Sequence, residues 1–174
     1  MARTETTTPA VDAAFVEDFF PRWLEAWNSH DADRLLALMT DDVSYEDSAW
    51  PTTLRGHADV RDFLRHAWTA FPDMRLELKD GPFLHPTMPS ATATWNGSLT
   101  HTGPIDPPGV APTGRHVEFA GFDLHEYRDG KVARLWICFD VAAIMRELGV
   151  LPPPGSRGER LTAKLANLQT RLRR

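Results

Sequence analysis

The chain has 174 residues, 42% hydrophobic and 25% charged, which suits one globular domain with a continuous core and excludes a disordered or fibrous protein. Its net charge of −5, with basic residues concentrated only at the C-terminus, excludes the one-sided positive face that nucleic-acid binding requires. The apolar stretches fall far short of the roughly 20 residues that cross a bilayer, and a single cysteine, Cys138, excludes an intrachain disulfide, so we expect a cytoplasmic protein without membrane contact.

Helical patterns fill the first half of the chain, after a tail expected to be flexible over residues 1–10. Apolar residues recur every fourth position from Val11 to Asn28 and predict an amphipathic helix, in which Pro21 would cause a kink or a restart. Asp31 can cap a second helix, and a third is predicted from Asp59 to Phe71.

The second half changes to the two-residue period of strands. Asp129-Gly130, between two such segments, is a strong hairpin signal because a tight turn needs positive φ at both positions. The proline-rich segment Gly103–Gly114 predicts a rim loop, and a short helix is expected after Asp140. The predicted strands are Val43–Asp47, Met74–Phe83, Ala91–His101, Val117–Tyr127 and Val132–Phe139.

Residues 151–174 form a predicted proline linker followed by an amphipathic helix, outside a domain of residues 11–150. Leu161, Leu165, Leu168 and Leu172 follow at helical spacing beside basic residues. This face has no aromatic residue, which favours docking on its own domain or a twin subunit over a membrane role.

Three sequence blocks occur in an order that resembles a known family. They are Trp27-Asn28 through Asp41-Asp42-Val43-Ser44-Tyr45, Thr100-His101-Thr102-Gly103 through Pro112-Thr113-Gly114-Arg115, and Tyr127-Arg128-Asp129-Gly130-Lys131-Val132 through Trp136 and Asp140 to Glu147-Leu148-Gly149. The chain resembles the SnoaL-like polyketide cyclases, ester-cyclase relatives in the nuclear-transport-factor and ketosteroid-isomerase superfamily, over about Phe15 to Val150.

The resemblance implies an α+β fold, in which a cone-shaped, curved antiparallel sheet packs against three N-terminal helices around a central pocket and is often dimeric. It also implies an intramolecular aldol ring closure without metal or cofactor. An aspartate at the end of the last strand acts as general base in characterised members, and Asp140 occupies the matching position here.

Strand pairing provides a separate test of that assignment. A two-residue turn at Asp129-Gly130 would pair Tyr127 with Val132 and alternate the remaining side chains between two faces. A bulge would reverse the inference for Asp140. The predicted pairs are His125 with Arg134, Asp123 with Trp136 and Gly121 with Cys138, which would group Asp123, His125, Arg134, Trp136, Cys138 and Asp140 on a mixed face typical of a pocket wall.

The proposed chemistry removes a proton from a carbon that neighbouring carbonyl groups acidify. Burial among apolar walls would raise the pKa of Asp140 and make it a better base. His125, Tyr45 and His101 are candidate donors to the resulting enolate, and Tyr45 lies on the same side of its strand as Asp47. Trp23, Trp95 and Trp136 are candidates for stacking on a flat substrate, and Asp123 for binding it.

Structural roles compete with each assignment. Asp140 could equally be the N-cap of the following helix, and His125 an exposed neighbour of Arg134. Trp23 and Trp95 suit a core, Tyr45 could satisfy one buried hydrogen bond, and Asp47 suits a loop cap.

The functional hypotheses therefore span two classes. The first is a cofactor-independent cyclase acting on a small apolar or aromatic carbonyl compound, as a homodimer. An isomerase or epoxide hydrolase is the alternative enzyme, and Asp140, Asp123 and Arg134 are the residues that epoxide opening could use. The third hypothesis is a non-catalytic ligand-binding or dimerisation module. The scattered histidines lack the spacing of a metal site, so no metal or cofactor is expected.

Overall fold

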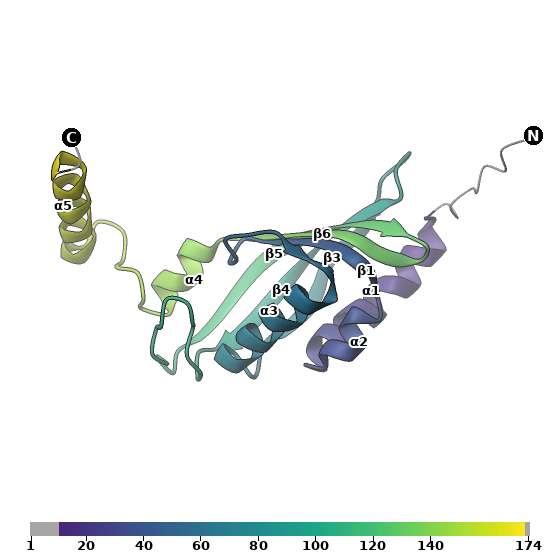
Figure 1. The fold of residues 1–174 in the computed structure, drawn as a ribbon, viewed down its shortest axis with the longest axis horizontal. Coiled ribbons are helices and arrows are strands. Elements are labelled where there is room, and N and C mark those ends of the chain that lie inside the picture. Colours follow the sequence, from purple (N-terminus) through teal and green to yellow (C-terminus); the bar gives the residue numbers. More distant parts are fainter. Residues whose placement is uncertain (1–10, 173–174) are drawn as a thin grey trace, which may run out of the picture.

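A computed structural model describes residues 11–172, and the tail expected over residues 1–10 lies outside this range. Helices and strands follow one another as the sequence predicts, with one additional short strand, β2 (Figure 1). The elements are α1 (Ala13–Asn28), α2 (Ala32–Leu36), β1 (Met39–Asp47), β2 (Leu54–Arg55), α3 (Gly56–Ala70), β3 (Arg75–Leu84), β4 (Ser90–Thr100), β5 (His116–Arg128), β6 (Lys131–Phe139), α4 (Val141–Glu147) and α5 (Arg157–Leu172).

One curved six-stranded sheet forms the frame, in the order β2-β1-β6-β5-β4-β3. Its neighbours are antiparallel except for β1 and β6, which run parallel and pair Tyr45 with Leu135. The expected antiparallel sheet thus contains one parallel pairing, because the chain enters β6 from the β5 hairpin in the direction that β1 already has.

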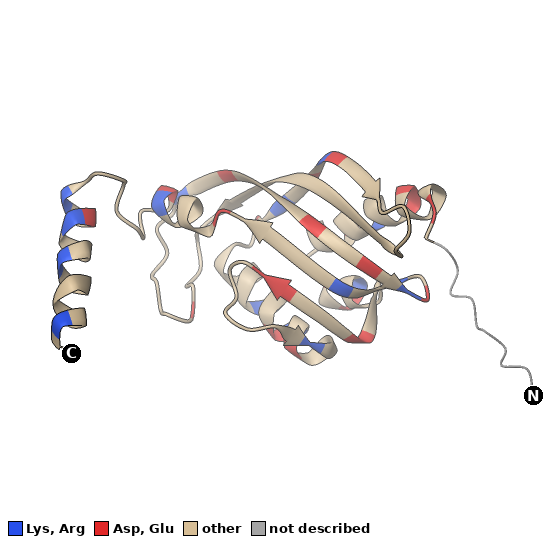
Figure 2. Cartoon of the chain, turned by 90° about the horizontal axis from the view of Figure 1, so that it is seen from above, with Lys and Arg blue, Asp and Glu red and all other residues tan. Residues whose placement is uncertain are grey.

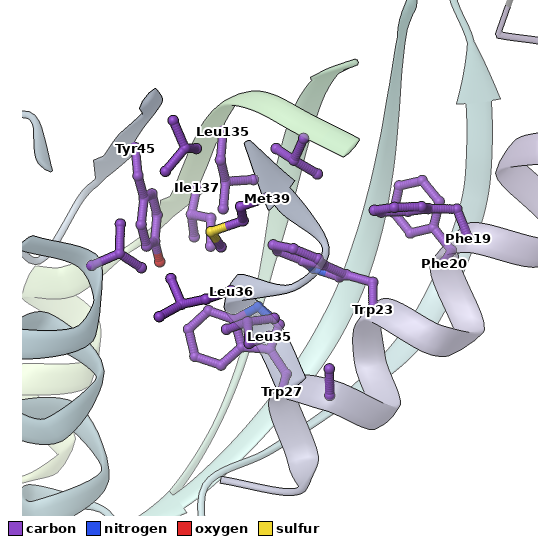
Figure 3. Packing of buried hydrophobic residues seen from close by; sticks show 14 of the residues in the cluster. Phe19, Phe20, Trp23, Trp27, Leu35, Leu36, Met39, Tyr45, Leu135 and Ile137 are labelled. Carbon is purple, nitrogen blue, oxygen red and sulfur yellow. The ribbon is translucent and has the colours of Figure 1, made fainter. Parts of the chain in front are cut away.

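The helices α1, α2 and α3 lie on the concave side of the sheet (Figure 1). Helix α1 begins at its N-cap Asp12, which accepts from the Phe15 N–H at 2.8 Å. It continues without interruption through Pro21, which faces solvent. Its apolar side chains point toward the strands in Figure 3, where Phe19 and Trp23 are fully buried. The core therefore lies between α1 and the sheet.

A second apolar cluster closes the other end of the sheet. It combines α4 with the ends of β4 and β5 through Leu99, Val117, Ile144 and Leu148. Beyond it, α5 stands apart from the domain and contains no buried residue (Figure 1). Within residues 11–172, none of the helices is long and apolar enough to span a membrane.

A β-bulge in the β5–β6 hairpin changes which side chains face the core. Tyr127 pairs with Val132 as predicted, but Glu126 pairs with Arg134, which leaves Ala133 as an extra residue in β6. Every later pair is shifted by one residue, and a shift of one residue reverses the face. The predicted pairs were wrong beyond this point: His125 lies opposite Leu135, Asp123 opposite Ile137 and Gly121 opposite Phe139.

Candidate active site

Three polar side chains follow one another on the inner face of β5. Asp123, His125 and Tyr127 occupy alternate positions of the strand and therefore point to the same side. His125 Nε2 lies 3.0 Å from Asp123 Oδ2, and the Tyr127 hydroxyl lies 3.2 Å from His125 Nδ1. When Nε2–H donates to Asp123, Nδ1 accepts from Tyr127, so the chain of bonds fits a neutral imidazole.

Aromatic rings of α1 enclose His125. The Phe20 ring stacks on the imidazole at 4.9 Å between centroids, and the Trp23 ring meets it edge-on at 4.7 Å. His125 is fully buried, so the exposed alternative was wrong. The predicted pairing of His125 with Arg134 was also wrong, because Arg134 bonds Glu46 and Glu126 on the other face of the sheet. The imidazole is consequently fixed in a dry, apolar setting.

A second polar pair comes from the end of β1. The buried Tyr45 hydroxyl donates to Asp47 Oδ2 at 3.0 Å, and the Ala49 N–H donates to Asp47 Oδ1 at 2.8 Å. Burial raises the pKa of Asp47 from 3.8 to about 6, against the opposing effect of these two hydrogen bonds.

The β1 pair is electrostatically linked to the β5 residues. Burial raises the pKa of the Tyr45 phenol well above its ordinary value, and the negative charges of Asp47 and Asp123 raise it further. Burial also raises the pKa of Tyr127, again with a contribution from Asp123. Both phenols therefore stay protonated and act as hydrogen-bond donors.

A hollow of about 200 Å³ opens at the end of β1, next to Asp47. Trp50 and Trp136 supply its aromatic lining, and the remaining wall consists of Glu46, Asp47, Ser48, Pro51, Thr52 and Thr53. An apolar cavity of about 150 Å³ can hold benzene, so this volume is sufficient for one aromatic ring. The hollow lies at the rim of the cone.

Two buried polar atoms near the β5 residues lack a hydrogen-bond partner within the described part of the chain: Asp123 Oδ1 and Trp95 Nε1. Trp95 is opposite Gly121 on the neighbouring strand, where an added Cβ would come within 2.4 Å of the indole. Because leaving a buried polar group unpaired is costly, these atoms are candidates for contact with a ligand.

Asp140 is not part of this group. It is exposed at the N-terminus of α4, where its Oδ1 accepts from the Ala143 N–H at 2.8 Å. The expected burial of its carboxyl group is not observed, because the bulge in β6 turns its side of the strand outward. The structure shows the N-cap alternative.

The other residues selected from the sequence divide between the core, the opposite end of the domain and the outer face. Trp23 and Trp95 are core residues, with 1% and 3% of their surface exposed. His101 is also buried, but it lies at the end of β4, where Nδ1 accepts from the Thr113 N–H at 3.2 Å. Trp136 is 42% exposed on the outer face and reaches the site only as a wall of the hollow.

The epoxide-opening set is also separated. Asp123 is inside the cone, whereas Arg134 and Asp140 are on its surface. Within residues 11–172 there is no group of three His, Cys, Asp or Glu side chains placed to hold a metal ion.

Asp47 was predicted from the sequence only as a loop cap. The same-side placement of Tyr45 and Asp47 was available from the two-residue period of the strand, and the loop-cap role is confirmed by the Ala49 contact. What the sequence did not indicate was the burial that raises the pKa of Asp47.

A curved sheet that wraps three helices, with polar side chains inside, defines the α+β fold of NTF2-like proteins. The chain belongs to the SnoaL-like polyketide cyclase family, whose model matches residues 17–148. A comparison with curated protein sequences found no match.

Solved structures share the fold at low sequence identity. AclR from Streptomyces galilaeus is 23% identical, with 93% of this chain and 98% of AclR covered and a TM-score of 0.68. TsrD from Streptomyces laurentii is 26% identical, with 80% and 98% covered and a TM-score of 0.67. TerC, co-crystallized with polyporic acid, is 19% identical, with 78% and 98% covered and a TM-score of 0.61.

Proposed function

We propose that the chain is a cofactor-independent acid–base enzyme that closes a ring in a polyketide-like carbonyl compound by an intramolecular aldol reaction. The observation that carries the proposal is Asp47, a carboxyl group with a pKa of about 6 that lines a largely polar hollow containing two tryptophans. A base is most effective when its pKa lies near the working pH, so the raised pKa makes Asp47 a better base than an ordinary aspartate. Family membership supports the reaction class.

The base in this proposal is Asp47 rather than Asp140. Its carboxylate removes a proton from a carbon flanked by carbonyl groups, and the C–H electron pair becomes an enolate. The enolate carbon attacks a second carbonyl carbon of the same molecule, which forms the C–C bond and moves charge to that oxygen. The proton held by Asp47 then returns to this oxygen, so the enzyme ends unchanged.

Tyr45 has a positioning role in this scheme. Its hydroxyl holds Asp47 Oδ2 at 3.0 Å, and the rigid strand below it fixes the direction of the carboxylate. Trp50 provides an aromatic side chain to a flat substrate in the hollow. TerC, which shares the fold, was crystallised with polyporic acid.

Asp123, His125 and Tyr127 support the site from within. Their hydrogen bonds fix the inner face of β5, and the charge of Asp123 acts on Tyr45.

Hydrogen exchange tests the base directly. A panel of aromatic ketones in deuterated water should exchange acidic C–H protons faster with the protein than without it. Asp47→Asn should abolish this acceleration and leave ketone binding within a few fold, because the amide keeps the shape but cannot accept the proton. Asp140→Asn is the matched control and should retain full acceleration.

The alternative outcomes identify other functions. If Asp140→Asn removes the acceleration and Asp47→Asn retains it, the base is the aspartate selected from the sequence. If the wild-type protein binds ketones without accelerating exchange, it is a ligand-binding module.

A homodimer is part of the proposal, as the family resemblance leads us to expect. The sheet surface that faces away from α1, α2 and α3 exposes Phe122 and Trp136 to 36% and 42%. Paired aromatic side chains of this size on an uncovered sheet are typical of a contact surface.

A further inference from the structure

The convex face of the sheet carries a patch, here called the outer face, that no helix covers (Figures 1 and 2). Its apolar centre contains a Phe122–Trp136 pair with ring centroids 5.7 Å apart. Strand pairing places Phe83, Leu124 and Cys138 on the same side. A hollow of about 600 Å³, lined in part by Glu77, Asn96 and Glu118, continues the face over β3, β4 and β5.

The C-terminal arm, helix α5, presents an apolar stripe that the rest of the chain does not cover. Leu161, Leu165, Leu168 and Leu172 are 59%, 55%, 53% and 79% exposed. Their spacing of four, three and four residues places them on one side of the helix. An amphipathic helix derives most of its stability from packing this side against a partner, so the stripe requires one.

The connection to α4 directs the arm away from its own sheet. Leu148 is buried, and the Val150 and Leu151 N–H groups both bond Met145 O, which fixes the exit from the domain. After Pro152–Pro154, the Arg160 side chain bonds Gly155 O at 2.7 Å and fixes the start of α5. Beyond this exit α5 stands apart from the sheet of its own chain, and none of its residues is buried there (Figure 1).

Charge favours the domain of a second copy as the binding partner of the arm. The described arm has four basic residues, Arg157, Arg160, Lys164 and Arg171, against Glu159, and residues 157–174 contain six of the 19 basic residues of a chain with a net charge of −5. The outer face itself is mixed, with Glu46, Glu77, Asp80, Glu118 and Glu126 beside Arg55, Arg75, Arg128, Lys131 and Arg134. The opposite charge belongs to the rest of the chain as a whole: residues 157–174 carry +5 (six basic, one acidic), so residues 1–156 carry −10 of the net −5. Figure 2 looks onto this face and shows acidic positions along its strands and basic ones along α5.

We infer that the arm of one copy docks on the outer face of a second copy, with its leucines over Phe122 and Trp136, and that the exchange is reciprocal. At about 24 Å, a 16-residue helix fits along β5, whose 13 residues extend about 43 Å. Pairing of one arm with another is less favourable for two reasons. A helix of about two heptads is too short for a stable coiled coil. An antiparallel pair would also bring the like charges of Lys164 and Arg171 near each other. The inference extends the proposed homodimer by naming its contact.

The test uses full-length variants in sedimentation velocity. Leu165→Asp places a charge in the apolar stripe, and Asn167→Asp, with the same charge change on the opposite side of the exposed helix, is its control. We expect Leu165→Asp to raise the dissociation constant of the dimer by roughly tenfold or more, because the apolar contact of the leucine is lost. Asn167→Asp should leave the dissociation constant near that of the wild-type protein. Added salt should weaken the wild-type dimer.

A mixing experiment identifies the surface that the arm contacts. Phe122→Glu disrupts the outer face and leaves the arm intact, whereas Leu165→Asp does the reverse. Each variant alone should be largely monomeric, while an equimolar mixture should regain a heterodimer, because one intact arm meets one intact face. Circular dichroism on both variants confirms that the domain is folded; if Phe122→Glu unfolds it, Glu118→Lys replaces it as the face variant.

Three results would overturn the inference. A Leu165→Asp protein that remains fully dimeric would show a homodimer built without the arm, so the proposed dimer would survive and the arm contact would not. A dimeric Phe122→Glu protein would show that the arms pair with each other. A monomeric wild-type protein would contradict both the homodimer and the arm contact, without affecting the hydrogen-exchange test of Asp47.

Discussion

Asp123 and His125, two residues apart on β5, form a buried hydrogen-bonded pair in which carboxylate Oδ2 and imidazole Nε2 are 3.0 Å apart. Their side chains expose 3% and 0% of their surface. Both face inward because they are two residues apart on the same regular strand. The extra residue in β6 places them opposite the apolar Ile137 and Leu135 rather than Trp136 and Arg134, so strand register determines the apolar surroundings of the pair.

Removing one member of this pair should cost more than removing both. Breaking a buried pair by His125→Phe or Asp123→Val should lower the free energy of unfolding by roughly 3 kcal/mol, because the remaining group is unpaired. The double variant should recover about 2 kcal/mol of the summed losses. Urea unfolding measures the cycle, with Tyr127→Phe as a control that removes one hydroxyl. Strictly additive losses would contradict the pairing.

The catalytic rate should depend on ionisation of Asp47. With a pKa of about 6, its carboxylate form predominates above that pH, so kcat/KM for ketone exchange should rise through pH 6 and then level off. With an unperturbed aspartate as the base, kcat/KM would instead rise near pH 4. The pH profile of wild-type exchange provides the measurement, and a rate already at its plateau at pH 5 would exclude Asp47 as the base.

Stability should change with pH in the opposite direction. Between pH 3.8 and about 6 the folded chain holds a proton on Asp47 that the unfolded chain releases, so this group's contribution is present at low pH and is lost as pH rises. The loss should be about 2 kcal/mol, and Asp47→Asn should remove it. Urea midpoints of both proteins at pH 4 and pH 7.5 test this expectation. If the urea midpoints of the wild-type and Asp47→Asn proteins change equally between the two pH values, burial does not raise the pKa of Asp47.

Asp140 should behave as a helix cap. Asp140→Ala should lower the free energy of unfolding by about 1 kcal/mol because the Ala143 N–H loses its acceptor. Asp140→Ser should restore most of this stability and retain exchange activity, since serine also caps a helix. Thermal unfolding and the ketone assay on both variants decide the role, and an inactive, stable serine variant would return Asp140 to the chemistry.

Gly121 should tolerate no side chain. A Cβ there would lie 2.4 Å from the Trp95 ring and 2.8 Å from Cys138 O, so Gly121→Ala should cost roughly 1 to 3 kcal/mol and displace the indole. Thermal unfolding and tryptophan fluorescence report the two effects. Ala120→Ser, one residue away on the exposed side, is the control. An unchanged melting temperature in Gly121→Ala would show that the indole has room to move.

The sequence predicted the order of elements because periodicity and turn chemistry are local. The repeats of Phe15, Phe19 and Trp23 defined α1, and Asp129-Gly130 defined the last hairpin. Pairing between distant segments was less accessible: the parallel contact of Tyr45 with Leu135 and the short strand β2 had no local signal.

The candidate site depends on a single-residue irregularity that periodicity does not encode. A regular hairpin would place Asp123 and Asp140 on one face, whereas the extra Ala133 separates them. Tyr45 was correctly placed toward the inside, and Asp47 was on its side of the strand. The raised pKa of Asp47 depends on surrounding burial, which only the folded chain has.

The parallel pairing of β1 with β6 also affects how the chain can fold. The partner of β1 lies about 90 residues later, so α1, α2 and α3 are synthesised before the central strand that they cover. Contacts this distant in sequence make folding slow, because the intervening loop must close first. We expect the N-terminal half to bind chaperones on the ribosome until β6 emerges and the apolar surfaces of the helices are enclosed.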